Sequence, residues 1–114
     1  MKKLLTVCLL AFAAAGATGC RSAAEGVKPK LMWLDCSANW GRFSYPDSIR
    51  YYVNKCRESG MTALVLDVKG TSSEVVYPSE HAPQVREWKG FARPDFDFVG
   101  TFVEAAHDAR LEIY

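Results

Sequence analysis

The sequence predicts an α/β fold built on a parallel β-sheet. Residues 30–35, 62–68 and 111–114 are short, nearly continuous apolar runs, as in strands that are covered on both faces. Apolar residues at helical spacing occupy the stretches between these runs. The order strand–helix–strand–helix–strand implies right-handed crossovers, and therefore neighbouring parallel strands.

The first helix is predicted to begin within residues 45–48, where Pro46 stands beside candidate N-cap residues. One apolar stripe follows at positions i, i+3, i+4 and i+7, namely Ile49, Tyr52, Val53 and Cys56. Gly60 stands where a left-handed C-terminal cap would end the helix.

The second helix is predicted to begin at Pro94 and Asp95, after a long loop over residues 70–93. Its apolar stripe is Val99, Phe102, Val103 and Ala106. Three strands and two helices leave both sheet edges and much apolar surface uncovered. We therefore expect residues 1–114 to be the N-terminal part of a longer protein.

Residues 1–19 have the cationic start and the apolar centre of a secretory signal peptide. The segment ends in Ala-Thr-Gly before Cys20, which resembles the lipobox of bacterial lipoproteins, where the signal is cleaved before a cysteine that carries lipid. The resemblance implies lipidation of Cys20, with residues 20–29 as a short polar tether. The alternative is a plain signal peptide or an uncleaved anchor, with Cys20 as an incidental thiol.

Location and partners follow from the same segment. Arg21 follows Cys20, in place of the Asp that retains lipoproteins at the inner membrane, so we expect a cell-envelope protein, lipid-anchored in the outer membrane and facing the periplasm. Without residues 1–19 the net charge is −1, which excludes the basic footprint needed to hold a phosphate backbone. The expected partners are a membrane, through the lipid, and no nucleic acid.

The two remaining cysteines are predicted to be free. Cys36 follows the first strand, whereas Cys56 lies about nine residues into a helix that runs back, roughly 14 Å along its axis. A disulfide needs Cα atoms within about 7 Å of each other. Glu80 and His81 lack a second cluster at metal-ligand spacing, and no nucleotide-binding or hydrolase motif occurs, so neither a metal nor a cofactor is expected.

Polar residues follow two of the predicted strands, at the carboxyl ends where parallel α/β sheets bind ligands. Asp35 ends the first strand, and Asp67 and Lys69 end the second on one face, with Leu66 and Val68 on the other. These charged groups are candidate contacts to a polar ligand. An equally weighted alternative is a structural ion pair between Asp67 and Lys69.

Aromatic residues in the loops are the other candidates for ligand contacts. Trp40 and Tyr77 fall on the presumed ligand side of the sheet, where flat apolar faces can stack on sugar rings. The alternative is that each packs under its own loop. Trp33 lies within the first strand and is predicted to be a core residue.

The order of five segments resembles the beginning of the glycosyl-hydrolase-like family ten. These are Trp33-Leu-Asp35, Pro46-Asp-Ser-Ile49, the strand Ala63-Leu-Val-Leu-Asp-Val-Lys-Gly70 with Val76-Tyr-Pro-Ser79 after it, Arg93-Pro-Asp-Phe-Asp97 and Val103-Glu-Ala-Ala-His107. The resemblance covers about residues 30–114, and a neighbouring family of glycosidases shares part of it. One departure is Arg110, where the family usually has glycine.

The resemblance implies that residues 30–114 are the first two and a half βα units of a (β/α)8 TIM-type barrel. It also implies glycoside hydrolysis by two carboxylates. In related barrels these lie on later strands, so no catalytic residue is expected within residues 1–114. Asp35, Trp40, Asp67, Lys69 and Tyr77 would then be substrate contacts.

The sequence thus predicts the lipid-anchored N-terminal part of a glycoside hydrolase that acts on an envelope or dietary glycan. Residues 1–114 alone should be inactive. Two alternatives stay open at this point: a non-catalytic glycan-binding lipoprotein, and a nonfunctional truncated product.

Overall fold

The computed structural model describes residues 28–70 and 72–114. The predicted signal peptide, the predicted lipidation site Cys20 and most of the predicted tether lie outside these residues. None of the helices in the described ranges has both the length and the apolar character needed to cross a membrane.

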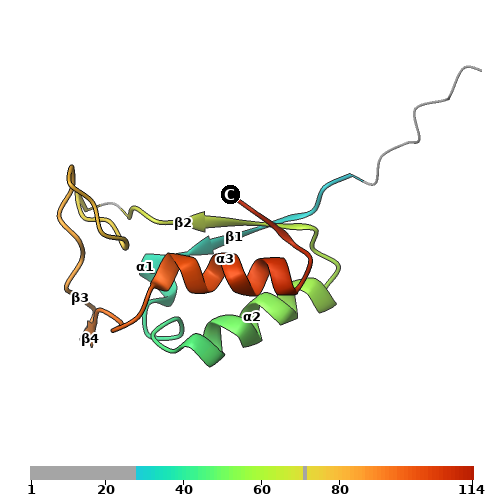
Figure 1. Ribbon diagram of the computed structural model, residues 1–114, viewed down its shortest axis with the longest axis horizontal. Helices are drawn as coiled ribbons and strands as arrows, with labels where there is room; N and C mark the ends of the chain where they lie inside the picture. The colour runs from blue at the N-terminus through green and yellow to red at the C-terminus, as the bar shows by residue number, and fades with distance from the viewer. Residues whose placement is uncertain (1–27, 71) are drawn as a thin grey trace, which may run out of the picture.

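A three-stranded parallel sheet forms one layer of the fold (Figure 1). Strand β1 (Leu31–Asp35) pairs with β2 (Ala63–Asp67), and β2 pairs with β5 (Glu112–Ile113), so the spatial order is the order in the chain. The parallel sheet predicted from the alternation of strands and helices is therefore confirmed.

Two helices, α2 (Pro46–Glu58) and α3 (Phe98–Asp108), cover the same face of the sheet (Figure 1). Pro46 opens α2 as predicted, and Ile49, Val53 and Cys56 are its buried positions. The prediction that the second helix begins at Pro94 and Asp95 was wrong. The helix begins at Phe98 because Asp97 is the N-cap, with its Oδ1 accepting a hydrogen bond from the Gly100 N–H at 2.9 Å.

Left-handed residues follow both helices. Gly60, after α2, has a φ of 79°. Arg110, after α3, has a φ of 57°, and its N–H donates to the carbonyl oxygen of His107 at 2.9 Å. Arg110 therefore occupies a backbone conformation that favours glycine, at a cost of roughly 1 kcal/mol.

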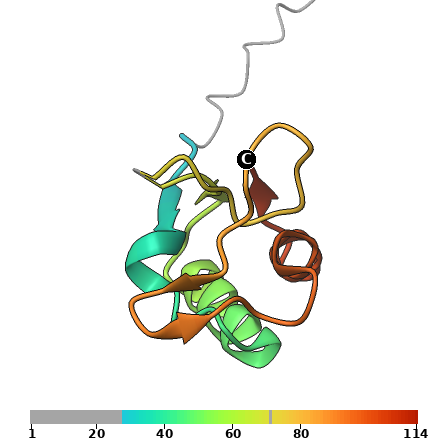
Figure 2. The same cartoon turned by 90° about the vertical axis from the view of Figure 1, so that its left-hand side faces the viewer.

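Two small elements lie outside the predicted strands and helices. A single turn, α1 (Cys36–Asn39), follows β1 directly. Within the long loop, β3 (Glu87–Trp88) and β4 (Phe91–Ala92) pair as an antiparallel hairpin, seen in Figure 2 at the end of the sheet where β1 and β2 finish. Lys89 and Gly90 turn the hairpin with φ values of 51° and 83°, the signs that a type I′ turn requires.

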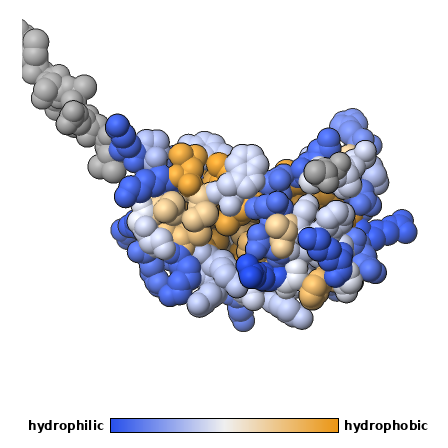
Figure 3. All heavy atoms as spheres, turned by 180° about the vertical axis from the view of Figure 1, so that it is seen from behind, coloured by the Kyte–Doolittle hydropathy of each residue, from blue (hydrophilic) through white to orange (hydrophobic). Residues whose placement is uncertain are grey.

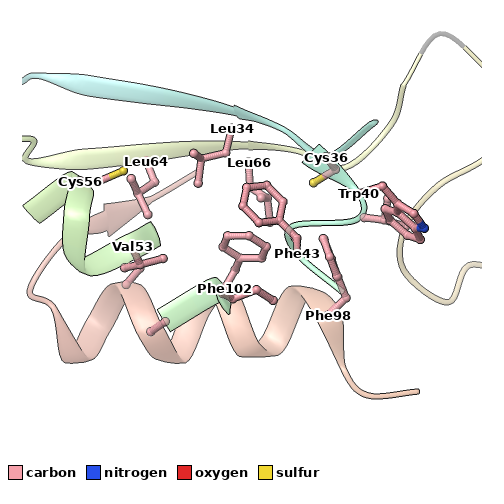
Figure 4. Close-up of a cluster of buried hydrophobic side chains, with 14 of the residues drawn as sticks. Leu34, Cys36, Trp40, Phe43, Val53, Cys56, Leu64, Leu66, Phe98 and Phe102 are labelled. Atoms are coloured by element: carbon pink, nitrogen blue, oxygen red, sulfur yellow. The ribbon is translucent and has the colours of Figure 1, made fainter. Parts of the chain in front are cut away.

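The core lies between the sheet and the two helices (Figure 4). Leu34, Leu64 and Leu66 point from the strands toward Val53 of α2 and Phe102 of α3. Phe102 is fully buried, with its ring centroid 5.0 Å from that of Phe43 and 5.3 Å from that of Phe98. Burial of these side chains holds the helices on one face of the sheet.

The prediction that Trp33 is a core residue was wrong. Trp33 is 64% exposed because it points to the face of the sheet that α2 and α3 do not cover. Leu31, two residues earlier on the same strand, is 51% exposed. From behind, hydrophobic atoms reach the surface near the N-terminal end of the described chain (Figure 3).

Candidate functional site

Asp35 and Asp67 end β1 and β2 and lie on the same face of the sheet. They are register partners, and the residues before them, Leu34 and Leu66, point to the helices. Strand alternation therefore directs both carboxylates to the uncovered face. They line a cavity of about 350 Å³ together with Ser37, Ala38, Gly70 and Lys89. We call this cavity the strand-end site.

Backbone N–H groups orient both carboxylates. Asp35 Oδ1 accepts from the Ala38 N–H at 2.8 Å and so caps α1. Asp67 Oδ1 accepts from the Lys69 N–H at 3.2 Å. Within residues 28–70 and 72–114, the Oδ2 atom of neither residue accepts a hydrogen bond, so each keeps one oxygen for a ligand.

Lys69 contributes its backbone N–H to the site rather than its charge. Its side chain is exposed and does not line the cavity. Among the residues that the structure describes, no ion pair joins Lys69 to Asp67, so the alternative of a structural ion pair is wrong. The β2 strand ends at Asp67, and Lys69 instead pairs with Val75 in an isolated bridge.

Lys89 is the cation that the hairpin brings to the strand-end site, and it is not among the residues predicted from the sequence. Lys89 is the first turn residue between β3 and β4, far along the chain from Asp67. The Lys-Gly pair between two short strand-like runs could have indicated the turn. Nothing local could have indicated that the turn meets the end of β2.

Cys36 lies beside the two carboxylates but remains a thiol. It is 1% exposed, and burial, followed by the negative charges of Asp67 and Asp35, raises its pKa to about 12. A thiol that stays protonated at neutral pH is a poor nucleophile. Cys36 and Cys56 are both free, as predicted.

Trp40 is buried, at 2% exposure, so the alternative that it packs beneath the loops is confirmed and its role as a stacking contact was wrong. Its ring centroid is 5.4 Å from that of Phe98, and its Nε1–H donates to the carbonyl oxygen of Phe91 at 3.1 Å. The indole therefore ties the β3–β4 hairpin to the core. Gly41 assists, because a Cβ atom there would lie 2.7 Å from the Phe91 ring.

Tyr77 lies in a second cavity, of about 500 Å³, in front of α3. Its side chain is 38% exposed. The cavity shares no lining residue with the strand-end site. Its walls are Val76, Tyr77, Pro78, Gln84, Arg93, Pro94, Asp95, Phe96, Asp97 and Phe98. We call it the Tyr77 cleft. The predicted contact residues therefore do not all belong to one site.

No grouping of three or more potential metal ligands occurs in the described ranges of the chain. His81 and His107 are both exposed. The His107 side chain does not border the core, because the buried positions of α3 are Phe98, Phe102, Ala105 and Ala106.

Comparison with known proteins gives one informative likeness. The chain is 28% identical over 95 residues to an "S-layer-related protein" of Niallia circulans. The aligned region covers 76% of this chain but only 6% of that protein, so the chain corresponds to a small part of a much longer relative. No protein-family model matches the chain. No solved structure matches it either.

Proposed function

We propose that this chain is the glycan-contacting, N-terminal part of a lipid-anchored glycoside hydrolase of the cell envelope. The observation that carries the proposal is the strand-end site. Two carboxylates from neighbouring parallel strands, Asp35 and Asp67, line one cavity at the carboxyl edge of the sheet. Active sites of (β/α)8 barrels lie at this edge.

The chemistry of the strand-end site suits a sugar. Each carboxylate is held by a backbone N–H through Oδ1 and keeps Oδ2 for a ligand hydroxyl. Lys89 and Ser37 add donors at the same cavity. A hydrogen bond to a charged group contributes about 1.5–3 kcal/mol, so two such contacts would be the main source of affinity.

The arrangement of the sheet supports a barrel. Successive parallel strands are neighbours, and both crossover helices lie on one face. A (β/α)8 barrel begins in this way and places its other sheet face inside the barrel. On this proposal Trp33 and Leu31 belong to the barrel interior, and the acid and the nucleophile come from strands beyond residue 114.

The relative supports an envelope location. The name "S-layer-related protein" associates that protein with the S-layer. The lipobox-like segment before Cys20 supplies the anchor in this proposal, with the outer membrane as the location. The anchor is tested by expressing the full chain in a bacterium and measuring the mass of its mature N-terminus. An acylated Cys20 supports it, and a residue without lipid contradicts it.

Glycan binding is tested with the full chain purified from membranes in detergent. The probes are arrayed oligosaccharides of glucose, N-acetylglucosamine, xylose and mannose. Asp67→Asn should weaken binding by about 10-fold or more, because an amide accepts a weaker hydrogen bond than a carboxylate does. The control is Glu104→Gln on the exposed side of α3. Equal binding by both variants, or no binding by the parent chain, would contradict the proposal.

A further inference from the structure

The Tyr77 cleft has the composition of a binding site of its own. Aromatic and proline faces from Tyr77, Pro78 and Phe96 line it beside the polar side chains of Gln84 and Arg93. Ligand cavities of about 300–1,000 Å³ characteristically combine apolar faces with a few placed polar groups, and this cavity measures about 500 Å³.

Hydrogen bonds tie the walls of the cleft together. The Val75 N–H donates to the Pro83 carbonyl oxygen at 3.0 Å, and the Val85 N–H donates to the Val75 carbonyl oxygen at 2.9 Å. Gln84 links the two walls through its side chain. Its Nε2 donates to the Val76 carbonyl oxygen at 3.3 Å, and its Oε1 accepts from the Arg93 guanidinium at 2.7 Å. The polar groups are thus positioned before any ligand arrives.

The aromatic residues form a fixed base and an open face. Phe96 packs against the core and stacks on Phe98, with ring centroids 6.4 Å apart and an angle of 29° between the rings. Tyr77, by contrast, remains 38% exposed at the cleft. An aromatic ring that is open at a cleft, as Tyr77 is, is suited to pack against the apolar face of a sugar ring.

The charges at the cleft favour a neutral ligand. Arg93 lies beside Asp95 and Asp97, so a ligand with either sign of charge would meet a like charge. Arg93 is held by a neutral amide, and no ion pair involves it in the described part of the chain. Its remaining guanidinium N–H groups can donate to hydroxyl oxygens, and the Asp95 carboxylate can accept from hydroxyl groups.

We infer that the Tyr77 cleft is a second glycan-binding site that takes a neutral pyranose unit, with Tyr77 as its stacking platform and Arg93 as its main donor. The class of ligand in this inference, a glycan, rests on the proposed function. The loop and hairpin that contribute lining residues to the cleft and to the strand-end site lie at the end of the molecule where β1 and β2 finish (the backbone is seen in Figure 2). A glycan long enough to reach both sites should bind more tightly than a single sugar.

The test compares Tyr77→Ala with Tyr51→Ala in the full chain. Tyr51 is 57% exposed on α2 and lines neither cavity, so it controls for the loss of a surface tyrosine. The probes are the hexasaccharides and monosaccharides of glucose, N-acetylglucosamine, xylose and mannose, with the galacturonic acid hexasaccharide as the acidic comparison. Tyr77→Ala should weaken binding of the best neutral hexasaccharide by about 10-fold. Tyr77→Phe should retain the affinity for this hexasaccharide, because the aromatic ring remains.

The outcomes separate this inference from the proposed function. Loss of affinity in Asp67→Asn but not in Tyr77→Ala overturns the cleft and leaves the strand-end site standing. Loss in Tyr77→Ala but not in Asp67→Asn supports the cleft and overturns the strand-end site. Tighter binding of the acidic hexasaccharide overturns the neutral-ligand inference. No binding of any probe by the parent chain overturns both proposals. Circular dichroism of each variant confirms that the fold is retained.

Discussion

Both faces of the β1–β2 sheet carry apolar side chains, but only one face is covered by helices. On the face toward α2 and α3, Leu34, Leu64 and Leu66 are 8%, 0% and 7% exposed. On the other face Trp33 is 64% exposed, and the neighbouring Val65 is half-buried. The difference teaches that a continuous apolar run identifies a strand but does not say which of its side chains find a partner.

The difference arises from the direction of the crossovers. Two right-handed β–α–β connections between sequential neighbours place both helices on one side of the sheet. Within the described residues, no further helix or strand covers the other side. The two carboxylates of the strand-end site lie at the rim of that uncovered face.

The largest expected effect is at Trp40, and Trp33 serves as its comparison on the other face of the sheet. Trp40→Ala should lower the free energy of unfolding by about 3–5 kcal/mol, because a large buried ring leaves a cavity in the core. Trp33→Ala on the uncovered face should change it by no more than about 0.5 kcal/mol. Urea unfolding followed by far-UV circular dichroism measures both. Similar losses would mean that the uncovered face is occupied in solution.

The pH dependence of stability tests the burial of the Cys36 thiol, which lies at the end of the core beside the two carboxylates. The pKa of Cys36 is raised to about 12 in the folded chain, from an ordinary value of 9.0. Between these values the unfolded chain releases a thiol proton that the folded chain keeps. Stability is therefore fully present below pH 9 and falls as pH rises toward 12, by up to about 1.4 kcal/mol per pH unit.

The measurement is the free energy of unfolding of the parent chain and of Cys36→Ala at several values between pH 8 and pH 11. The parent should lose stability more steeply, since only it carries this thiol. Asp67→Asn should reduce the steepness, because the negative charge of Asp67 is one cause of the raised pKa. Parallel curves for the parent and Cys36→Ala would show that the thiol is more accessible than the fold indicates.

A smaller effect is expected at the start of α3, the helix that covers one face. Asp97→Ala removes the side-chain cap on the Gly100 N–H and should cost about 1 kcal/mol in unfolding free energy. Asp95→Ala, two residues earlier and outside the helix, is the matched control and should be close to neutral. Both values come from the same urea titration. A larger loss in Asp95→Ala would place the N-cap elsewhere.

The smallest expected effect is a gain of stability at the other end of α3. Arg110→Gly should raise the free energy of unfolding by roughly 0.5–1 kcal/mol, because glycine adopts the positive φ without strain. Ala109→Gly should lower it, since Ala109 has a right-handed conformation with a φ of −79°. Thermal unfolding compares the two variants. Destabilisation by Arg110→Gly would indicate that the Arg110 side chain makes a contact that outweighs the strain.

Local patterns were sufficient to predict most of the regular structure. Apolar runs identified the strands, the stripe of Ile49, Val53 and Cys56 identified α2, and Pro46 marked its start. The boundary of α3 was missed by a few residues, because a Pro-Asp pair and a second Asp both resemble helix starts. The hairpin was missed because each of its strands has two residues, too few to show a period.

The sequence by itself determined the parallel order of the strands, the two free cysteines and the placement of Asp35 and Asp67 at the carboxyl ends of two strands. These features depend on local periodicity and on the rule that parallel strands end together. Only the tertiary structure decided that Trp40 is buried, that Trp33 is exposed and that Lys89 rather than Lys69 lines the strand-end site. The physical reason is distance along the chain. The Trp40 indole, for example, bonds to a carbonyl 51 residues away, and no local pattern encodes that contact.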